Sequence, residues 1–593
     1  MKKILLLIGS ALLLSGCLSV NPCKKKENVV TKSCYIDLME KTLSAYSTAH
    51  IDRYFNQVKS EGLKEHGFPR LTANIGILIA HKRRTDLMER FIAMMDFCCQ
   101  QIPKVIAANE FSIKEIIFCM EELEKNRTVP AAKIEEWKNH LRKVKPYSCY
   151  TKLAKTKDDI VYNWAAFGML SEYMRKKAGA TAENNDDVID LQAYSQIRHL
   201  DENGMYRDPG CPMVYDFVTR GLFALLLHEG YQGKYKDIWQ NALERSAIAT
   251  LEMISVNGEL PAGGRSHQFL HNEAHVALMM EFYAGMFAKK GDMINAGRCR
   301  ATVARALKNI SFWLNKKPIS HIRNRFPIES KYGCEKYAYF DKYMITAASF
   351  LYAASRFCDE SIPPVELDDN KGMTLQTSDH FHMLFLRAGE YSAQYDYDAR
   401  QYYNGEKYHD CSGITRIHKK GAPSEICMSV SCPGTPKYSV DIKDPFPLSI
   451  TPGVCIEGKW IYATDMSVKH KVRSHHAEGN SANAEVECSF PGGKSVTGKY
   501  KLNREGLTIQ MSGSDDIRCL LPVFRFNGES STKVRQNDDT LTIEFEGHVC
   551  TYKVLNGTLK DLKKAARNRN GHYDAFAAEG KNDLTVKISI EKL

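Results

Sequence analysis

The sequence predicts a two-part protein: an α/α toroid (an incomplete α/α barrel) followed by an antiparallel β-sandwich. Apolar residues recur with a helical period from about Tyr35 to Phe357, and alternating apolar and polar residues follow. A stretch rich in Pro and Asp separates the two patterns. With 593 residues, the chain is long enough for two hydrophobic cores. We expect the toroid over 33–360, a linker over 361–374 and the sandwich over 375–593.

The N-terminus has the form of an export signal. Two lysines precede an apolar run over 4–14, and Leu-Ser-Gly-Cys17 follows. This order resembles a bacterial lipoprotein signal peptide with its lipobox. The resemblance implies removal of residues 1–16, a lipid on Cys17 and a tether over 17–32. Leu18 is not an acidic retention signal, so we expect an outer-membrane lipoprotein that faces the periplasm or the cell surface.

Charge and cysteine content narrow the range of partners. The net charge of +11 becomes +9 when the two signal lysines are removed (11 − 2), and no dense Lys/Arg stripe with aromatics is present. We therefore expect no nucleic-acid partner, and an anionic polysaccharide fits better. The 18 cysteines lack the spacing of a zinc site. No metal or other cofactor is expected to be required, and a structural divalent cation in the sandwich is left open.

Ten segments of the first part have helical periodicity, separated by short Gly, Pro or Asn breaks. Consecutive antiparallel hairpins without a fixed repeat favour a toroid over a solenoid, with loop ends and helix starts around a central cleft. The predicted helices cover roughly 35–59, 84–99, 112–126, 130–143, 158–177, 214–229, 235–255, 268–289, 291–315 and 336–356.

The second part alternates apolar and polar residues between Gly, Asn and Asp turns, which is typical of half-buried strands. About fifteen strands in a β-sandwich fit its length. The clearest segments are 380–398, 413–420, 494–513 and 539–557.

The stretch from Gly258 to Met280 has the highest density of reactive side chains, at the point where a Gly-rich loop becomes a helix. Ser266 is the predicted N-cap. Three histidines spaced four residues apart would then share one helix face, an arrangement that rarely converges on one tetrahedral metal. A helix N-terminus with an arginine and imidazoles is suited to hold a carboxylate. The polar residues are Arg265, His267, Gln268, His271, Asn272, Glu273 and His275.

Three further segments carry candidate site residues. The loop 201–217 contains Arg207 and Tyr215, and the loop 324–344 contains several tyrosines, of which Tyr337 is one. Asn163 and Trp164, in the predicted helix 158–177, supply an amide and a ring on which a sugar can stack. On a toroid, these segments are expected to converge on the central cleft.

Tyr, His, Asn and Arg together suit β-elimination of a uronic acid polymer. The C5 proton of a uronate becomes acidic when the neighbouring carboxylate is neutralised by an amide, a guanidinium or an imidazole. A His or Tyr then accepts that proton, and a Tyr donates one to the departing glycosidic oxygen.

The predicted architecture on an exported chain resembles the heparinase II/III-like and alginate-lyase-like polysaccharide lyases. In residues, the resemblance is carried by His271-Asn272, by the Tyr-rich loop and by Gly-Ile-Thr-Arg-Ile-His over 413–418. It implies that Asn272 and His271 (or His267) neutralise the carboxylate and that Tyr337 or Tyr215 shuttles the proton. The sandwich would add His409 or His476. Substrate-binding residues would be Arg207, Arg265, Gln268, Asn163, Trp164, His409 and His476.

Two alternatives remain open from the sequence. An α/α-barrel glycoside hydrolase, exo-glucuronidase-like, needs two carboxylates across the cleft, and the candidates are Glu273, Asp216 and Glu335. A non-catalytic, glycan-binding surface lipoprotein would use some of the 5 Trp and 29 Tyr as stacking platforms. The residue types that face the cleft distinguish elimination from hydrolysis.

Overall fold

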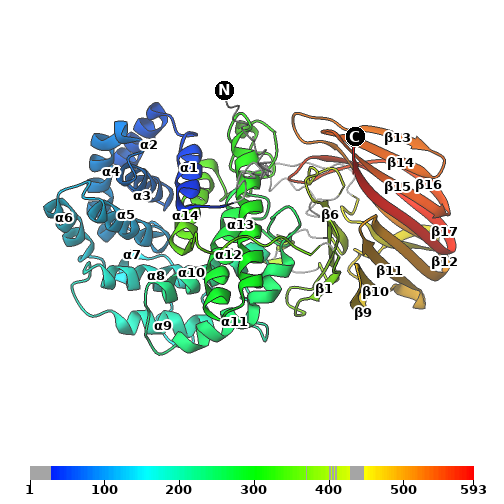
Figure 1. Cartoon of the computed structure of the whole chain (residues 1–593), viewed down its shortest axis with the longest axis horizontal. Helices are drawn as coiled ribbons and strands as arrows, with labels where there is room; N and C mark the ends of the chain where they lie inside the picture. The colour runs from blue at the N-terminus through cyan, green and yellow to red at the C-terminus, as the bar shows by residue number, and fades with distance from the viewer. Residues whose placement is uncertain (1–28, 369, 400–401, 404–405, 408–410, 428–445) are drawn as a thin grey trace, which may run out of the picture.

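The computed structural model describes residues 29–368, 370–399, 402–403, 406–407, 411–427 and 446–593. The expected signal peptide, Cys17 and His409 lie outside these residues. Helices fill one half of the molecule and strands the other (Figure 1). The last helix ends at Phe357 and the first strand begins at Met373.

The helical half is a toroid. Six helices contact one another in sequence, α3–α5–α8–α10–α12–α14, and the ring closes because α14 packs on α3. Helices α9, α11 and α13 pack against the inner helix that precedes each of them. The helices are α1 (Lys32–Leu43), α2 (Thr48–Glu61), α3 (Gly67–Ala80), α4 (Met88–Gln101), α5 (Ile113–Lys125), α6 (Ala131–Leu141), α7 (Pro146–Cys149), α8 (Asn163–Lys177), α9 (Asp186–Ile197), α10 (Met213–His228), α11 (Lys236–Met253), α12 (His271–Lys289), α13 (Met293–Leu314) and α14 (Phe340–Phe357).

The helix boundaries differ from the predicted ones in two informative ways. The predicted helix 35–59 is two helices, because the chain turns after Leu43 and Ser47 caps α2 by accepting a hydrogen bond from the His50 amide at 3.2 Å. Helices α3, α7 and α9 were not predicted. Every residue of α3 is buried, so it lacks the polar face on which helical periodicity depends.

The strands form two main sheets and a short hairpin. The four-stranded sheet has the order β1-β2-β3-β6, with β1 (Met373–Gln376), β2 (Met383–Ala388), β3 (Tyr391–Asp396) and β6 (Gly413–Lys419); β4 (Tyr402–Tyr403) pairs with β5 (Glu406–Lys407). The eleven-stranded antiparallel sheet contains β7 (Thr451–Ile456), β8 (Lys459–Tyr462), β9 (Lys469–Glu478), β10 (Ser481–Ser489), β11 (Ser495–Asn503), β12 (Gly506–Phe526), β13 (Lys533–Asn537), β14 (Thr540–Phe545), β15 (His548–Asn556), β16 (Thr558–Arg567) and β17 (His572–Lys592).

The smaller sheet is the middle layer of the molecule. In β2, Met383 and Phe385 join the core of the helical half, whereas Leu384 and Leu386 join the core between the two sheets. Side chains alternate between the faces of a strand, so a strand that is buried on both faces is largely apolar, and the buried Arg387 of β2 is paired with Glu252. The sandwich therefore packs against the toroid through its smaller sheet (Figure 1).

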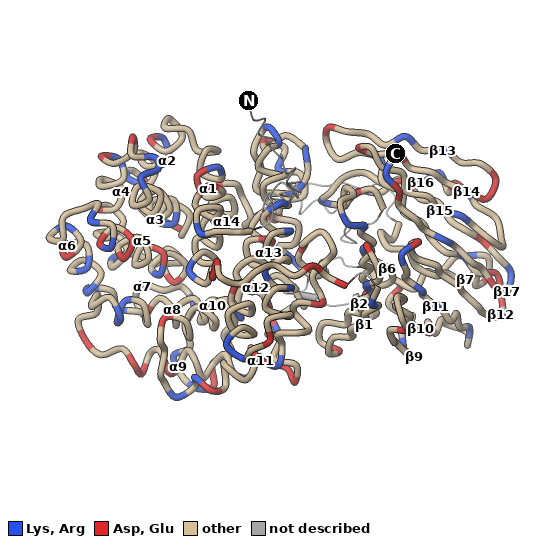
Figure 2. The backbone as a smooth tube through the Cα atoms, in the orientation of Figure 1, with Lys and Arg blue, Asp and Glu red and all other residues tan. Residues whose placement is uncertain are grey.

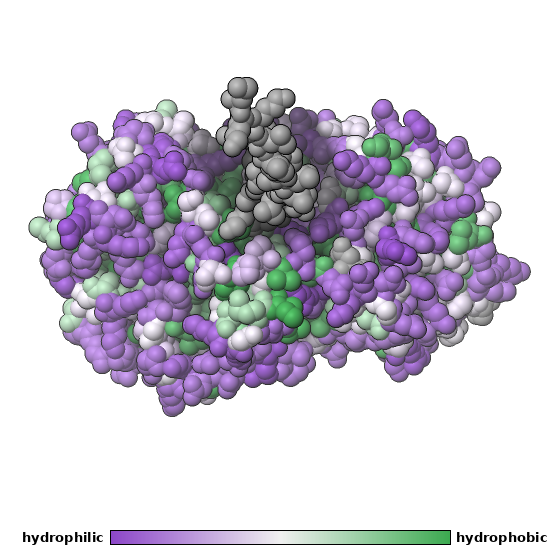
Figure 3. All heavy atoms as spheres, viewed as in Figure 1, coloured by the Kyte–Doolittle hydropathy of each residue, from purple (hydrophilic) through white to green (hydrophobic). Residues whose placement is uncertain are grey.

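The charges on the molecule show no single basic face in the view of Figure 2, in which Lys/Arg and Asp/Glu positions are interspersed over both halves. Hydrophilic residues cover most of the face drawn in Figure 3, with small apolar patches between them. Among the described residues, none of the helices combines the length and the apolar character that a membrane crossing requires.

Candidate active site

A cavity of about 1090 Å³ opens at the end of the toroid where the inner helices begin. Its wall includes residues at or close to the first turns of α3, α8, α10, α12 and α14. Each helix N-terminus carries partial positive charge, so this end of the ring favours an anion.

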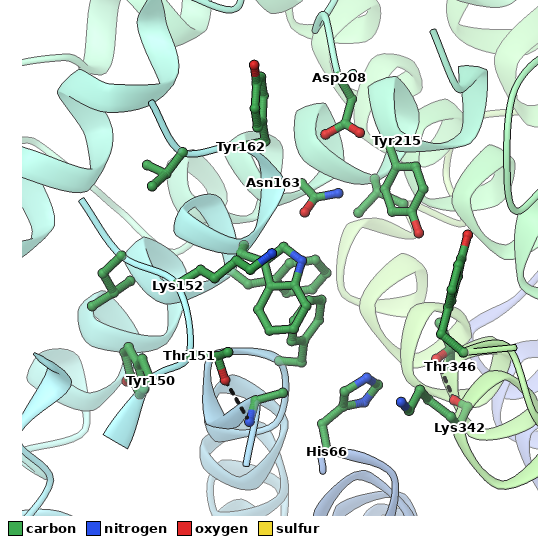
Figure 4. Close-up of a pocket in the computed structure, with 18 of the residues that line it drawn as sticks. His66, Tyr150, Thr151, Lys152, Tyr162, Asn163, Asp208, Tyr215, Lys342 and Thr346 are labelled. Atoms are coloured by element: carbon green, nitrogen blue, oxygen red, sulfur yellow. Dashed lines mark hydrogen bonds between the residues drawn. The ribbon is translucent and has the colours of Figure 1, made fainter. Parts of the chain in front are cut away.

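Six of the predicted site residues line this cavity, although they come from four separate segments of the chain. Asn163 and Trp164 open α8, and Tyr215 lies in the first turn of α10. In Figure 4, Asn163 and Tyr215 face the same space. The six are Asn163, Trp164, Tyr215, Arg265, His271 and Tyr337.

The loop before α12 brings Arg265 to the cavity through an unusual backbone. Gly264 has φ +70, and a side chain at this position would place its Cβ 2.5 Å from the Cα of Pro212. This close approach pairs Arg265 with the carboxylate of Asp208 and with the carbonyl of Pro209. The guanidinium carbon lies 4.5 Å from the ring centroid of Tyr215. Arg265 is therefore fixed beside the Tyr215 ring.

Ser266 is not the helix cap that the sequence predicts. Its φ is +62, α12 begins only at His271, and the cap position belongs to Leu270. The Ser266 amide instead donates to Glu335 at 2.7 Å. Its hydroxyl oxygen lies at the centre of what we call the hydroxyl cluster, within hydrogen-bonding distance of three tyrosine hydroxyls: Tyr215 (3.2 Å), Tyr337 (3.1 Å) and Tyr343 (3.2 Å).

Burial keeps Tyr337, Tyr343 and His271 of the site uncharged at neutral pH. Burial, followed by the charge of Glu335, raises the pKa of Tyr337 well above its usual range. Burial also raises the pKa of Tyr343, with Tyr215 and Glu335 as further causes. Burial lowers the pKa of His271 to about 3, assisted by the positive charge of Arg70. At neutral pH, His271 is therefore a neutral hydrogen-bonding group rather than an acid.

Five predicted site residues that the structure describes do not line the cavity. The Asn272 side chain shapes the turn into α12, since it accepts from the Phe269 amide at 2.9 Å and donates to the Ser266 carbonyl at 3.1 Å. Arg207 donates to backbone carbonyls of residues 198–200. His476 is exposed on β9, in the outer sheet. The other two, which are buried against β-domain residues 569 and 570, are His267 and Gln268.

His267 and His271 consequently do not share a helix face, because His267 precedes α12. The His267 carbonyl accepts from Arg569, which also pairs with Glu335 at 2.7 Å. Burial and the nearby arginines lower the pKa of the His267 ring well below its usual value. Among the described residues, no group of three or more His, Cys, Asp or Glu side chains is arranged to hold a metal ion.

The three alternative carboxylates also lie outside the cavity wall. Asp216 is fully buried and paired with Arg220. Glu273 lies 3.2 Å from Arg323, and Glu335 lies 2.7 Å from Arg569. Each of these carboxylates is buried beside an arginine and none lines the cavity, so they do not form the carboxylate pair across an open space that hydrolysis needs.

Several cavity residues were missed by the sequence analysis. His66 and Arg70 flank the start of α3, a helix that was not predicted. Lys152 lies in a loop without motif character. The only available signal was the Gly-Phe-Pro sequence at 67–69, since proline is favoured in a first helical turn.

The charge of the cavity wall is one-sided. Its cationic side chains are Arg70, Lys152, Lys155, Arg265 and Lys342. Among the described wall residues, Asp208 is the single carboxylate, and it is paired with Arg265. Figure 4 shows Lys152, Lys342 and Asp208 around the opening.

No family model matches the sequence, and a search of curated proteins finds no match. Among solved structures, heparinase III is similar, with 9% identity and a TM-score of 0.50; the match covers 97% of this chain and 87% of that one. A heparan sulfate lyase mutant from Pedobacter heparinus matches with 8% identity, 88% and 76% coverage and a TM-score of 0.48. A chondroitin AC lyase from Streptomyces coelicolor A3 matches with 9% identity, 94% and 83% coverage and a TM-score of 0.49. The heparinase III match agrees with the observed architecture, so the chain has a heparinase III-like fold, a helical toroid followed by a β-sandwich, as the sequence predicts.

Proposed function

We propose that this protein is a polysaccharide lyase that cleaves a uronic-acid-containing anionic polysaccharide by β-elimination. The observation that carries the proposal is the composition of the cavity wall. It combines an amide, a neutral imidazole, a guanidinium and tyrosine hydroxyls with one carboxylate, Asp208, which is already paired. Of the wall cations, Arg70, Arg265 and Lys342 pair with Glu115, Asp208 and Glu65. Lys152 and Lys155 add further positive charge to the wall, which suits a polyanion.

In this proposal, Asn163 and His271 hold the uronate carboxylate of the substrate. The amide and the neutral imidazole donate hydrogen bonds to the carboxylate oxygens, on which negative charge increases as the C5–H bond breaks. The guanidinium of Arg265, fixed beside the Tyr215 ring, adds positive charge close to the reacting centre. Asn163 takes the role that the sequence analysis gave to Asn272, because Asn272 is used inside the loop.

Tyr215 is assigned as the residue that moves the proton. Its hydroxyl belongs to the hydroxyl cluster and lies 3.4 Å from the hydroxyl of Tyr343. The phenolate form of Tyr215 accepts the C5 proton, and the electron pair of the C5–H bond forms the C4=C5 double bond. The C4–O bond breaks as the Tyr215 phenol returns this proton to the leaving oxygen. Burial raises the pKa of Tyr337 and of Tyr343 well above the usual range, so both stay protonated and can donate hydrogen bonds toward Tyr215 and the substrate.

The two alternative functions have less support. Hydrolysis needs a pair of carboxylates across an open space, and Asp208 has no second carboxylate opposite it among the described wall residues. Glycan binding without catalysis would not need the hydroxyl cluster, since stacking on rings such as Trp164 suffices for binding.

The test is ultraviolet absorbance during incubation of the purified protein with polyuronates and glycosaminoglycans. Elimination creates a double bond conjugated with the carboxylate, which absorbs in the ultraviolet, whereas hydrolysis does not. We expect absorbance to rise with an active substrate and to stay constant in Tyr215→Phe. New reducing ends without new absorbance would show that the protein is a hydrolase and not a lyase. Binding of a glycan without either product would show that it is a glycan-binding protein.

We also propose that the protein is an outer-membrane lipoprotein, attached through lipid on Cys17. The proposal depends on the lipobox-like sequence alone. Labelled palmitate should be incorporated by the wild type and not by Cys17→Ser, and only the wild type should fractionate with outer membranes. Equal membrane association of both would contradict the anchor.

A further inference from the structure

The cavity contains a group of buried polar residues that the proposed elimination step does not fully use. We call it the cavity floor and define it by His66, Arg70, His271, His275 and Thr346. Each of these side chains lines the cavity, yet each belongs to a residue that is at most 8% exposed. The floor is therefore a desolvated surface, in which charges and hydrogen-bond donors act strongly.

The floor carries an excess of positive charge. Arg70 Nε donates to Glu115 Oε1 at 2.9 Å, and Lys114 Nζ donates to the same oxygen at 2.9 Å. Two buried cations thus share one carboxylate, which leaves a formal charge of +1 (2 − 1). The remaining Arg70 nitrogen donates to the neutral Thr346 hydroxyl at 2.9 Å. Buried charge is costly unless it is balanced, so this arrangement favours an anion in the adjoining space.

Two histidines add hydrogen-bonding groups that have no protein partner. Both ring nitrogens of His275 and Nδ1 of His271 are buried without a hydrogen bond. The ring centroids of the two histidines lie 5.7 Å apart, and the His275 ring packs on Phe350 at 3.9 Å. Both rings are neutral because burial lowers the pKa of each, so each offers one N–H donor. Buried polar atoms in folded proteins are nearly always hydrogen-bonded, which points to a polar ligand here.

We propose that the cavity floor binds a second oxyanion group of the saccharide, either a carboxylate or a sulfate ester, beside the uronate carboxylate that Asn163 and His271 hold. Arg70 supplies the charge, and His275 supplies the N–H donor. That the anionic group belongs to a saccharide rests on the proposed function. That the floor binds an anion does not depend on it. The His271 ring lies 4.8 Å from the ring of Tyr343, so the floor adjoins the hydroxyl cluster. A sugar held beside Tyr215 therefore has its substituents next to the floor.

Titration of the purified protein with sodium sulfate and with sodium acetate tests the site without any polysaccharide. Sodium chloride at equal ionic strength is the reference, and calorimetry and thermal unfolding report binding. We expect wild type to bind at least one of the two anions beyond the chloride effect. In His275→Leu the affinity should fall about tenfold, as for loss of a hydrogen bond to a charged group. The anion that binds more tightly identifies the substituent.

His418→Leu is the matched control. His418 is also buried with both ring nitrogens unbonded, but it does not line the cavity. We expect it to bind sulfate or acetate like wild type, and Thr346→Val serves as a second floor variant if His275→Leu fails to fold. Absence of anion-specific binding in wild type, or an equal loss in His418→Leu, would overturn the proposal. Anion binding without ultraviolet product would refute only the lyase, and lyase activity without anion binding would refute only the floor site.

Discussion

Charged and polar residues lie on both sides of the segment from Glu259 to His275, but they line a cavity on one side and form a buried ion cluster on the other. On the cavity side, cationic and neutral polar groups surround an open space. On the opposite side, Glu259 and Glu273 each lie 3.2 Å from Arg323, in what we call the buried ion cluster. The cluster also contains Arg416 of the β-domain, 3.9 Å from Glu259, and burial raises the pKa of Glu273 to about 7. On this side arginines and carboxylates occupy the buried space themselves, whereas the cavity side leaves room for a ligand.

The buried ion cluster and its neighbours also hold the loop in position from the side of the β-domain. Arg416 donates to the Leu260 carbonyl at 2.7 Å, and Gln394 donates to the Ala262 carbonyl at 2.7 Å. Burial alone would raise the pKa of Glu259, but the positive charge of Arg323 and its neighbours holds this pKa at about 2. The β-domain thus acts on the cavity indirectly, through the backbone of the loop that carries Arg265.

The largest expected effect is on the cavity side. Tyr215→Phe should lower kcat by about 10⁴-fold, since it removes the proposed proton-transfer group. Its stability in urea should remain within about 1 kcal/mol of wild type, because the ring and its packing are kept. Tyr194→Phe, on the exposed face of α9, is the control and should keep full activity. Equal activity of both variants would show that Tyr215 does not move the proton.

The next effect is on the opposite side. Arg323→Met should lower the free energy of unfolding by about 4 kcal/mol, because Glu273 would remain buried without its arginine and Glu259 would keep only Arg416, 3.9 Å away. Urea unfolding followed by circular dichroism measures the loss. Adding Glu273→Gln to this variant should restore part of the stability. A loss below about 1 kcal/mol would mean that the cluster contributes little to the stability of the protein.

A smaller effect concerns pH. Burial lowers the folded-state pKa of His271 and of His418 to about 3 and that of His321 to about 4, whereas unfolded histidine titrates near 6.5. Between those values the unfolded chain binds more protons, so stability is lost as pH falls from about 6.5 toward 4. Each such histidine contributes about 1.4 kcal/mol per pH unit.

The His418→Leu variant isolates one contribution. Its urea-derived stability should fall less steeply over this pH range than that of wild type, by about 1.4 kcal/mol per pH unit. Parallel slopes for the two proteins would contradict a neutral His418 in the folded state.

The smallest effect is expected far from both regions. His476→Ala changes an exposed side chain on β9, so stability and activity should change by no more than about 0.5 kcal/mol in free-energy terms. A large loss of turnover in this variant would return the sandwich histidine to the active site and weaken the assignment of the cavity.

The sequence by itself determined the fold class, because the period of apolar residues changes from helical to alternating at one place in the chain. It also singled out the polar loop before α12 and six residues that line the cavity: Asn163, Trp164, Tyr215, Arg265, His271 and Tyr337. It missed α3, since a helix that is buried on all sides has no polar face to reveal its period. With α3 it missed His66 and Arg70.

Only the tertiary structure decided which polar side chains face the cavity and which are used in contacts inside the protein. Asn272 and Asn163 are both amides at helix starts, but only Asn163 lines the cavity, because Asn272 completes the turn into α12. The carboxylates of Glu273 and Glu335 form ion pairs with arginines from other segments of the chain, Arg323 and Arg569. Such pairings depend on contacts between residues far apart in the chain, and local periodicity and propensity carry no information about them.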